Sequence, residues 1–231
     1  MKHLTYGTAS VTLLIVAGLM LVATAAQAQQ RVVLTSPKPR YHQTLSQHEF
    51  ILEGGLAEPY GDQKDDFTTT DIGFGSTTGY EVGFRIRQYI GEKFAISPSF
   101  HYTRFGTASG FTDGNNSGSL AYEIRTSNYR YGLDFQALTG DSYSPMRLYV
   151  LGGISLVNNR YRDALEGNST YNASVNAPAY SAGLGLKFNN IEVAAEYVVN
   201  RFSTNKFTFD SLQHDFNWDS LVIRAALSFG R

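Results

Sequence analysis

The sequence has no cysteine and few prolines, methionines and tryptophans. Its 231 residues include 6 Pro, 3 Met and 1 Trp. The lack of cysteine excludes disulfides, a thiol nucleophile and a thiolate metal site. The chain carries 19 Lys and Arg against 20 Asp and Glu, so its formal net charge is −1. This near balance argues against nucleic acid as a partner, because nucleic-acid binding requires a basic stripe.

One long apolar run lies at the N-terminus. Residues 11–26, VTLLIVAGLMLVATAA, follow Lys2 and overlap an Ala-Gln-Ala sequence that ends at Ala28. A basic start, an apolar middle and an A-x-A end are typical of a secretory signal peptide, predicted here as residues 1–28. The alternative is an uncleaved anchor, because the uncharged stretch is long enough to span a membrane. Residues 29–47 show no periodicity and are predicted to be a periplasmic N-terminal segment.

No later apolar run approaches the roughly 20 residues that a membrane helix needs. If residues 48–231 enter a membrane, they must do so as strands. Open strand edges in lipid would leave backbone groups unpaired, so these strands must close into a barrel.

Residues 48–231 alternate with a period of two. In GYEVGFRIRQY, residues 79–89, apolar side chains fall at the even positions, with Glu81 and Arg85 on the opposite face. In SLVIRAALSF, residues 220–229, apolar side chains alternate with a second face that carries Arg224. Alternation predicts strands with one apolar and one polar face. The segment 146–157 is apolar on both faces and is predicted as a strand because an even strand count requires it.

The connections between these segments alternate in length. Three are short, at 90–93, 139–145 and 189–190, and four are long and polar, at 58–78, 106–122, 162–177 and 203–217. Short periplasmic turns and long external loops are typical of outer-membrane barrels. The sequence therefore predicts an all-β, eight-stranded antiparallel up-and-down transmembrane β-barrel over residues 48–231, in the bacterial cell outer membrane.

The polar faces of these strands predict a network of charges inside the barrel. The predicted lumen network comprises Glu53, Glu81, Arg85, Arg130, Asp134, Lys187, Glu192, Glu196 and Arg224, with Glu49 and Arg87 beside them. Facing lipid at the midplane, an Arg or Lys would cost about 2–4 kcal/mol. An eight-stranded barrel is just wide enough for side chains to fill. We therefore expect a plugged polar lumen.

The chain resembles the small eight-stranded outer-membrane barrels of the OmpA/OmpX type. The resemblance covers about residues 48–231 and rests on segments such as GYEVGFRIRQYIGEKFAISPSFHYTRFG and YSAGLGLKFNNIEVAAEYVV and on the aromatic C-terminal strand. It implies that the barrel insertion machinery is a partner and that Phe229 is the C-terminal insertion signal. Gly230 and Arg231 follow Phe229, whereas such families usually end in the aromatic residue itself.

Three motifs could indicate chemistry, and each has a simpler interpretation. His101 and Thr103 share a strand face, as in a lipid A-modifying hydrolase, but no acid is placed in the sequence to orient the histidine. DGNNSGSLAYE, from Asp113, resembles the start of a calcium loop but has Ile124 at the twelfth position. Gly183-x-Gly185 lies inside a strand and does not suit a nucleotide. No catalytic, cofactor-binding or metal-ligating residue is predicted.

Aromatic residues are predicted to form two belts at the membrane interfaces. The periplasmic belt would contain Tyr89, Phe94, Tyr149, Phe188 and Phe229, and the outer belt Phe105, Tyr122, Tyr161, Phe202 and Trp218. The acids Asp62, Asp65, Asp66 and Asp71 are predicted to lie in a solvated loop or to make a weak divalent-cation contact with lipopolysaccharide.

The predicted function is a structural or surface-interaction role through four external loops. Its partners would be outer-membrane lipids and an external ligand, with the barrel as a monomer. Three alternatives stay open: a small-solute channel, a lipid-modifying outer-membrane enzyme, and a secreted lipid-binding barrel of lipocalin type. In the last, the apolar faces would point inward.

Overall fold

The computed structural model describes residues 48–64, 73–114, 118–140, 144–165, 170–207 and 212–230. The predicted signal peptide and N-terminal segment lie outside this range, as do Asp65, Asp66 and Asp71. In the described part of the chain, no helix is long and apolar enough to cross a membrane.

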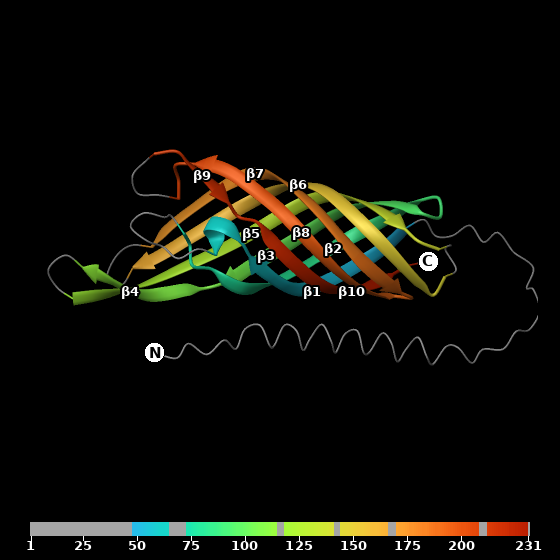
Figure 1. Cartoon of the computed structure of the whole chain (residues 1–231), viewed down its shortest axis with the longest axis horizontal. Coiled ribbons are helices and arrows are strands. Elements are labelled where there is room, and N and C mark those ends of the chain that lie inside the picture. The colour runs from blue at the N-terminus through green and yellow to red at the C-terminus, as the bar shows by residue number, and fades with distance from the viewer. Residues whose placement is uncertain are drawn as a thin grey trace, which may run out of the picture. The chain divides into compact units, whose positions relative to one another are not determined.

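Eight antiparallel strands form a closed ring (Figure 1). In chain order they are β1 (His48–Pro59), β2 (Thr77–Ile90), β3 (Phe94–Gly106), β5 (Gly118–Leu138), β6 (Met146–Leu165), β7 (Tyr171–Phe188), β8 (Ile191–Thr204) and β10 (Ser220–Phe229). Each strand pairs with the next, and β10 pairs with both β8 and β1, which closes the ring. The predicted fold class is confirmed.

Two short strands and a turn of 3-10 helix lie outside the ring. The strand β4 (Ala108–Gly114) pairs with β5, and β9 (His214–Asn217) pairs with β8. The 3-10 helix η1 (Gly61–Gln63) follows β1. Asp62 in η1 accepts a hydrogen bond of 2.7 Å from the backbone N–H of Asn217, so this acid anchors a connection.

Three strands are much longer than the sequence suggested. β5, β6 and β7 contain 21, 20 and 18 residues, whereas about 9–11 residues suffice to cross a bilayer. The regions 106–122 and 162–177, predicted as loops, are therefore largely strand, because backbone pairing continues beyond the apolar band. The polar composition of these regions indicated exposure to water and carried no information about pairing.

The short turns agree with the prediction at Asn189, whose positive φ of 52° suits a tight turn between β7 and β8. Pro98 lies inside β3, where its missing N–H removes a ladder hydrogen bond and favours a local bulge, yet neither ladder of β3 has a bulge at this residue. Pro98 stands opposite Leu133 in β5, and the register with β2 is the same on both sides of it. The register shift between β2 and β3 lies instead at Thr77–Tyr80.

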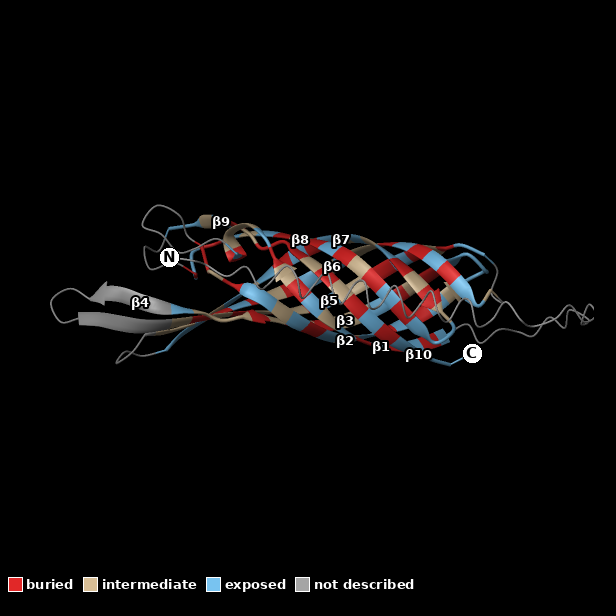
Figure 2. Ribbon diagram, turned by 60° about the horizontal axis from the view of Figure 1, so that its bottom comes forward, coloured by how far each residue is buried: buried red, intermediate tan, exposed pale blue. Residues whose placement is uncertain are grey.

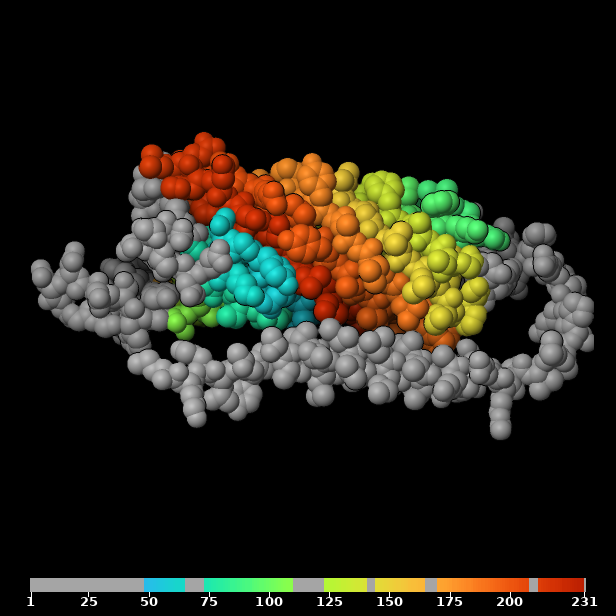
Figure 3. All heavy atoms as spheres, viewed as in Figure 1, coloured from blue at the N-terminus to red at the C-terminus, as the bar shows by residue number. Residues whose placement is uncertain are grey.

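Burial alternates along the barrel strands (Figure 2), and many of the large apolar side chains lie on the exposed face. Leu184 is 66% exposed, whereas the charged Glu196 and Arg224 are 1% and 2% exposed. Figure 3 shows one side of the molecule, where the cyan segment that includes the end of β1 lies beside the red C-terminal part of the chain. An apolar exterior around a polar interior is stable in lipid, and closed barrels of this type occupy bacterial outer membranes. The same orientation contradicts the lipocalin-type alternative.

The charged lumen as a candidate functional site

Two ion-pair networks lie in the barrel interior, and the first lies toward the short turns. The Arg87 guanidinium donates to both carboxylate oxygens of Glu192, at 2.6 and 2.7 Å, and to Glu49 at 2.9 Å. The Lys187 ammonium reaches the same two acids, at 2.9 Å from Glu49 and 3.3 Å from Glu192. Two bases therefore face two acids, drawn from β1, β2, β7 and β8.

The second network lies near the middle of the barrel and is centred on Glu196. Arg130 donates to Glu196 at 2.7 Å, and Arg224 donates to its other carboxylate oxygen. Arg130 and Arg224 also lie 3.5 Å from Glu81. All four side chains are buried. Two guanidinium groups thus share two carboxylates contributed by neighbouring and opposite strands of the ring.

Glu53 extends this network toward a buried histidine. It accepts a hydrogen bond from Arg85 at 2.7 Å and lies 3.4 Å from Arg224. The His101 Nε2 atom lies 2.9 Å from Glu53 and 3.1 Å from Arg224. The sequence analysis expected no acid beside His101, and this expectation was wrong, because Glu53 lies next to it. Glu53 is on β1 and His101 is on β3; the two strands are not paired, but their inward side chains meet in the lumen. Thr103 donates to Glu81 at 2.8 Å, so its hydroxyl is directed at that acid.

The structure places all nine predicted network residues inside the barrel. Eight of them take part in the two networks through the ion pairs given above. Asp134 is buried as well but makes no ion pair with a described residue. The role of this network in function stays a prediction.

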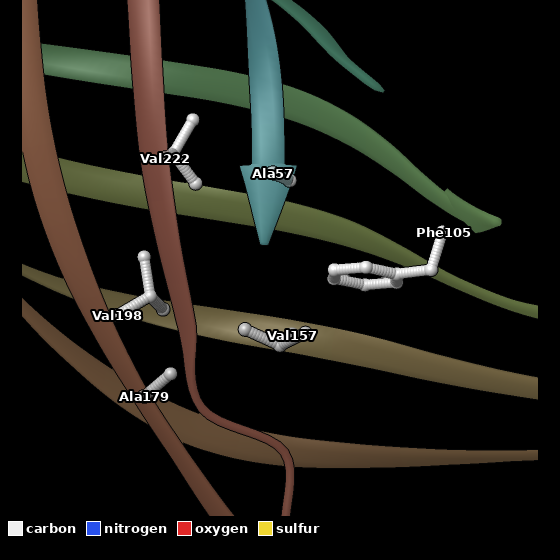
Figure 4. Close-up of a cluster of buried hydrophobic side chains, with 6 residues drawn as sticks. All are labelled: Ala57, Phe105, Val157, Ala179, Val198 and Val222. Carbon is white, nitrogen blue, oxygen red and sulfur yellow. The ribbon is translucent and has the colours of Figure 1, made fainter. Parts of the chain in front are cut away.

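Apolar side chains fill the lumen beyond each network. Toward the short turns, Tyr149 packs with Ala95, Leu138, Leu151 and Ala194. Toward the long connections, six strands each contribute one side chain to a shared layer (Figure 4). These six side chains are Ala57, Phe105, Val157, Ala179, Val198 and Val222.

An aromatic cap lies further toward the long connections. It comprises Phe74, Ile124, Tyr161, Phe207, Phe216 and Trp218. The Phe74 ring meets the Trp218 ring edge to face, with centroids 5.0 Å apart. Burial raises the pKa of the Tyr161 phenol, and the neighbouring Asp163 carboxylate raises it further. The cap is held by ring packing, which is worth about 0.5–1.5 kcal/mol per pair beyond area burial.

Six aromatic residues predicted for the belts point into the barrel instead. Phe105, Tyr149, Tyr161 and Trp218 are buried in the three apolar clusters, and the partly buried Tyr89 and Phe202 pack against two of them. Phe105 shares strand parity with His101, so the pleat directs it inward. Phe94 and Phe229 do face outward, at 60% and 51% exposed. The belt prediction placed residues by height along the strand and ignored which face they occupy.

A small cavity lies between the middle network and the aromatic cap. Its volume is about 10 Å³, and its lining includes Glu81, Asn128, Arg130 and Trp218. Each of these residues has one buried polar atom without a hydrogen-bond partner among the described residues. A space of this size suits roughly one water molecule, which needs two to four polar partners.

Several interior residues were not identified from the sequence. Asn159 and Asn200 exchange reciprocal amide hydrogen bonds of 3.2 and 2.7 Å across the lumen. Arg147 donates to the backbone oxygens of Thr139 and Glu92 near the short turns. Following the period of two along the whole of β6 would have placed Arg147 and Asn159 on one face, since both share parity with the buried Val157.

The motif at Asp113 and residues 115–117 falls where the structure does not describe the side chains. Within the described part of the chain, no group of three or more His, Asp or Glu residues could hold a metal ion.

No protein-family model and no curated protein matches the chain. Solved structures of similar fold include the attachment invasion locus protein Ail of Yersinia pestis, in complex with the heparin analogue sucrose octasulfate. The identity is 16%, with 79% of this chain and 99% of that chain covered and a TM-score of 0.47. Neisserial surface protein A is 15% identical, with 80% and 98% covered and a TM-score of 0.45. A major outer membrane protein of Thermus thermophilus is 12% identical, with 79% and 99% covered and a TM-score of 0.46. At these identities the likeness is one of fold.

Proposed function

We propose that this chain is a closed, non-conducting outer-membrane barrel that serves as a rigid base for its external segments. Its role is then structural or one of surface interaction. The observation that supports this proposal is the presence in the lumen of two ion-pair networks between layers of packed apolar side chains. Ions would have to displace both kinds of layer to pass.

The networks also oppose the channel alternative on energetic grounds. Each guanidinium of the two networks has at least one carboxylate partner at hydrogen-bond distance, so these charges neutralise one another and present no continuous wet path. Breaking one buried pair typically costs about 3–5 kcal/mol, because the remaining charge stays buried without a partner. Transient opening of such a lumen is therefore rare.

The enzyme alternative finds little support in the geometry of His101 and Thr103. Both side chains are buried inside the barrel, where a lipid chain has no access. The Thr103 hydroxyl donates to Glu81, whereas nucleophilic activation requires donation to the histidine. We propose a structural role for both residues within the network.

Conductance in planar lipid bilayers tests the proposal. Purified protein, shown to be folded by a gel mobility that shifts on boiling, should give no steady current. A reproducible unit conductance would contradict the closed lumen and favour the small-solute channel. Cell fractionation tests the location separately, and we expect recovery with the outer membrane.

A further inference from the structure

Four arginines face outward together on the barrel exterior, and we name them the arginine patch: Arg104 in β3, Arg125 in β5, and Arg160 and Arg162 in β6. Arg104 stands opposite Ser127, and Ser127 stands opposite Arg160, so these three residues form one row across three strands. Arg125 stands directly opposite Arg162 in the next row. They share strand parity with the outward-facing Phe100, Tyr131 and Leu156, so all four belong to the outer surface.

The positive charges of the patch are largely unbalanced. Arg125 donates to Glu123 at 2.6 Å. Arg104, Arg160 and Arg162 form no ion pair with any residue in the described part of the chain. Like charges directly opposite each other on neighbouring strands destabilise a sheet, which is the situation of Arg125 and Arg162. An anion bound between them would turn this repulsion into attraction.

The patch lies at the level where lipid headgroups meet the barrel. On β6 the exposed apolar side chains run from Met146 to Leu156. Ten residues of a strand tilted by about 40° rise roughly 26 Å, close to the 25 Å height of the apolar band of such barrels. Arg160 is the second outward residue beyond Leu156, on the side of the long connections. This side faces the cell exterior.

Aromatic rings connect the patch to the lipid-facing surface. The Arg160 guanidinium lies over the Tyr129 ring, 4.4 Å from its centroid, and that ring packs against Tyr102 at 4.9 Å. Stacking on a ring holds the guanidinium plane in place while its outer N–H groups stay available for a ligand.

We propose that the arginine patch binds the phosphate group of a phosphorylated lipid in the outer leaflet. Guanidinium groups bind phosphate through paired N–H···O bonds, and several of them converge here within reach of one or two phosphates. The lipid is favoured over a free anion because the patch is continuous with the apolar band, so a bound phosphate would carry its acyl chains onto that band. This inference goes beyond the closed-lumen proposal and does not depend on whether the lumen conducts.

Lipid retention measured by native mass spectrometry tests the site. The folded protein is exchanged into micelles that contain either doubly phosphorylated lipid A or the same lipid after enzymatic dephosphorylation. We expect the wild type to retain the phosphorylated lipid preferentially, and Arg160→Gln/Arg162→Gln to lower that retention about tenfold, since hydrogen bonds to charged groups are individually strong. Arg104→Gln is a second variant, and it should also lower the retention of the phosphorylated lipid.

Arg201→Gln is the matched control. Arg201 is an exposed arginine near the same end of the barrel, on β8, and lies 3.9 Å from Asp219. We expect this variant to retain phosphorylated lipid as the wild type does, and every variant is first shown to be folded by its gel mobility.

Three results would overturn the proposal. Equal retention of the dephosphorylated lipid would show that acyl chains alone are recognised. An equal loss of lipid retention in Arg201→Gln would show that retention depends on the net charge of the protein and not on a specific site. Complete displacement of the lipid by millimolar inorganic phosphate would show a site for a free anion. A current in the bilayer experiment, by contrast, would contradict the closed lumen and leave this site unaffected.

Discussion

At the residue scale, the barrel interior depends on charges that satisfy one another. Glu196 accepts from both Arg130 and Arg224, so its removal leaves two buried guanidinium groups short of a partner. Arg87 similarly holds Glu192 with two hydrogen bonds and Glu49 with a third. Removing one partner of such a buried pair is costly, because the other charge then stays buried without a partner. This penalty holds the paired side chains in a fixed arrangement.

Glu196→Ala should lower the free energy of unfolding by about 3–5 kcal/mol, because Arg130 and Arg224 stay buried without this carboxylate. Urea unfolding of the protein in lipid vesicles measures the change. Glu58→Gln is the control, since Glu58 pairs with Lys64 at the surface and should lose less than about 1 kcal/mol. Equal losses in the two variants would show that the lumen pairs contribute no more than a surface pair.

At the element scale, adjacent strands fit together through the size of their inner-face residues. Tyr149 in β6 stands opposite Gly185 in β7, and the missing side chain of Gly185 makes room for the tyrosine ring. A Cβ on Gly185 would lie 2.3 Å from the ring carbon that bears the hydroxyl. The Gly183-x-Gly185 sequence therefore has a packing explanation at its second glycine.

Gly185→Ala should destabilise the barrel by about 1–3 kcal/mol, because the Tyr149 ring is packed in a buried cluster and cannot retreat freely. Gly152→Ala on β6 is the control: its nearest neighbour would be a backbone oxygen at 3.8 Å. Unfolding of both variants in urea measures the difference. In a Tyr149→Leu background the cost of Gly185→Ala should shrink, and an unchanged cost would reject the steric explanation.

The segment between β9 and β10 carries the chain's single tryptophan into the aromatic cap. Trp218 is 0% exposed. Its fluorescence in the folded protein should be blue-shifted and protected from aqueous iodide, and unfolding should remove both properties. Phe216→Ala, which deletes a neighbouring ring of the cap, should increase quenching. Free quenching of the folded wild type would contradict the buried position.

At the scale of the whole molecule, closure of the ring joins the two ends of the described chain. Phe229 of β10 stands opposite Phe50 of β1, and both rings face outward. Lipid makes this closure obligatory, because an open edge would leave backbone groups without partners. The last strand must therefore be delivered correctly before the barrel is complete, which suits a recognition role for Phe229.

Phe229→Ala should reduce the amount of barrel recovered in the outer membrane while leaving the stability of the folded fraction nearly unchanged, if Phe229 is an insertion signal. Phe94→Ala removes a comparably exposed ring near the same end and is the matched control. Quantitative blots of outer-membrane fractions, with and without boiling, measure recovery. Equal recovery of both variants would reject the special role of Phe229.

The amino-acid sequence by itself determined the fold class and the orientation of the faces. A period of two separates inner from outer side chains, as at Leu184 and Glu196. Residues 48–231 contain no apolar run long enough for a membrane helix, which leaves a closed barrel as the arrangement of this region suited to lipid. The period of two is a local property of the strand, and the need for closure is set by the lipid solvent. Neither argument requires knowledge of which distant residues are in contact.

Only the tertiary structure decided which side chains meet inside. Arg87 and Glu192 are 105 positions apart in the sequence. Their pairing depends on the stagger of the strands around the ring, because the stagger sets the height of each inner residue along the barrel axis. The alternation of apolar and polar residues does not encode this stagger. The same stagger brings Glu53 to His101 and aligns the outward arginines of three strands, because registers, and not residue types, fix neighbours across a sheet.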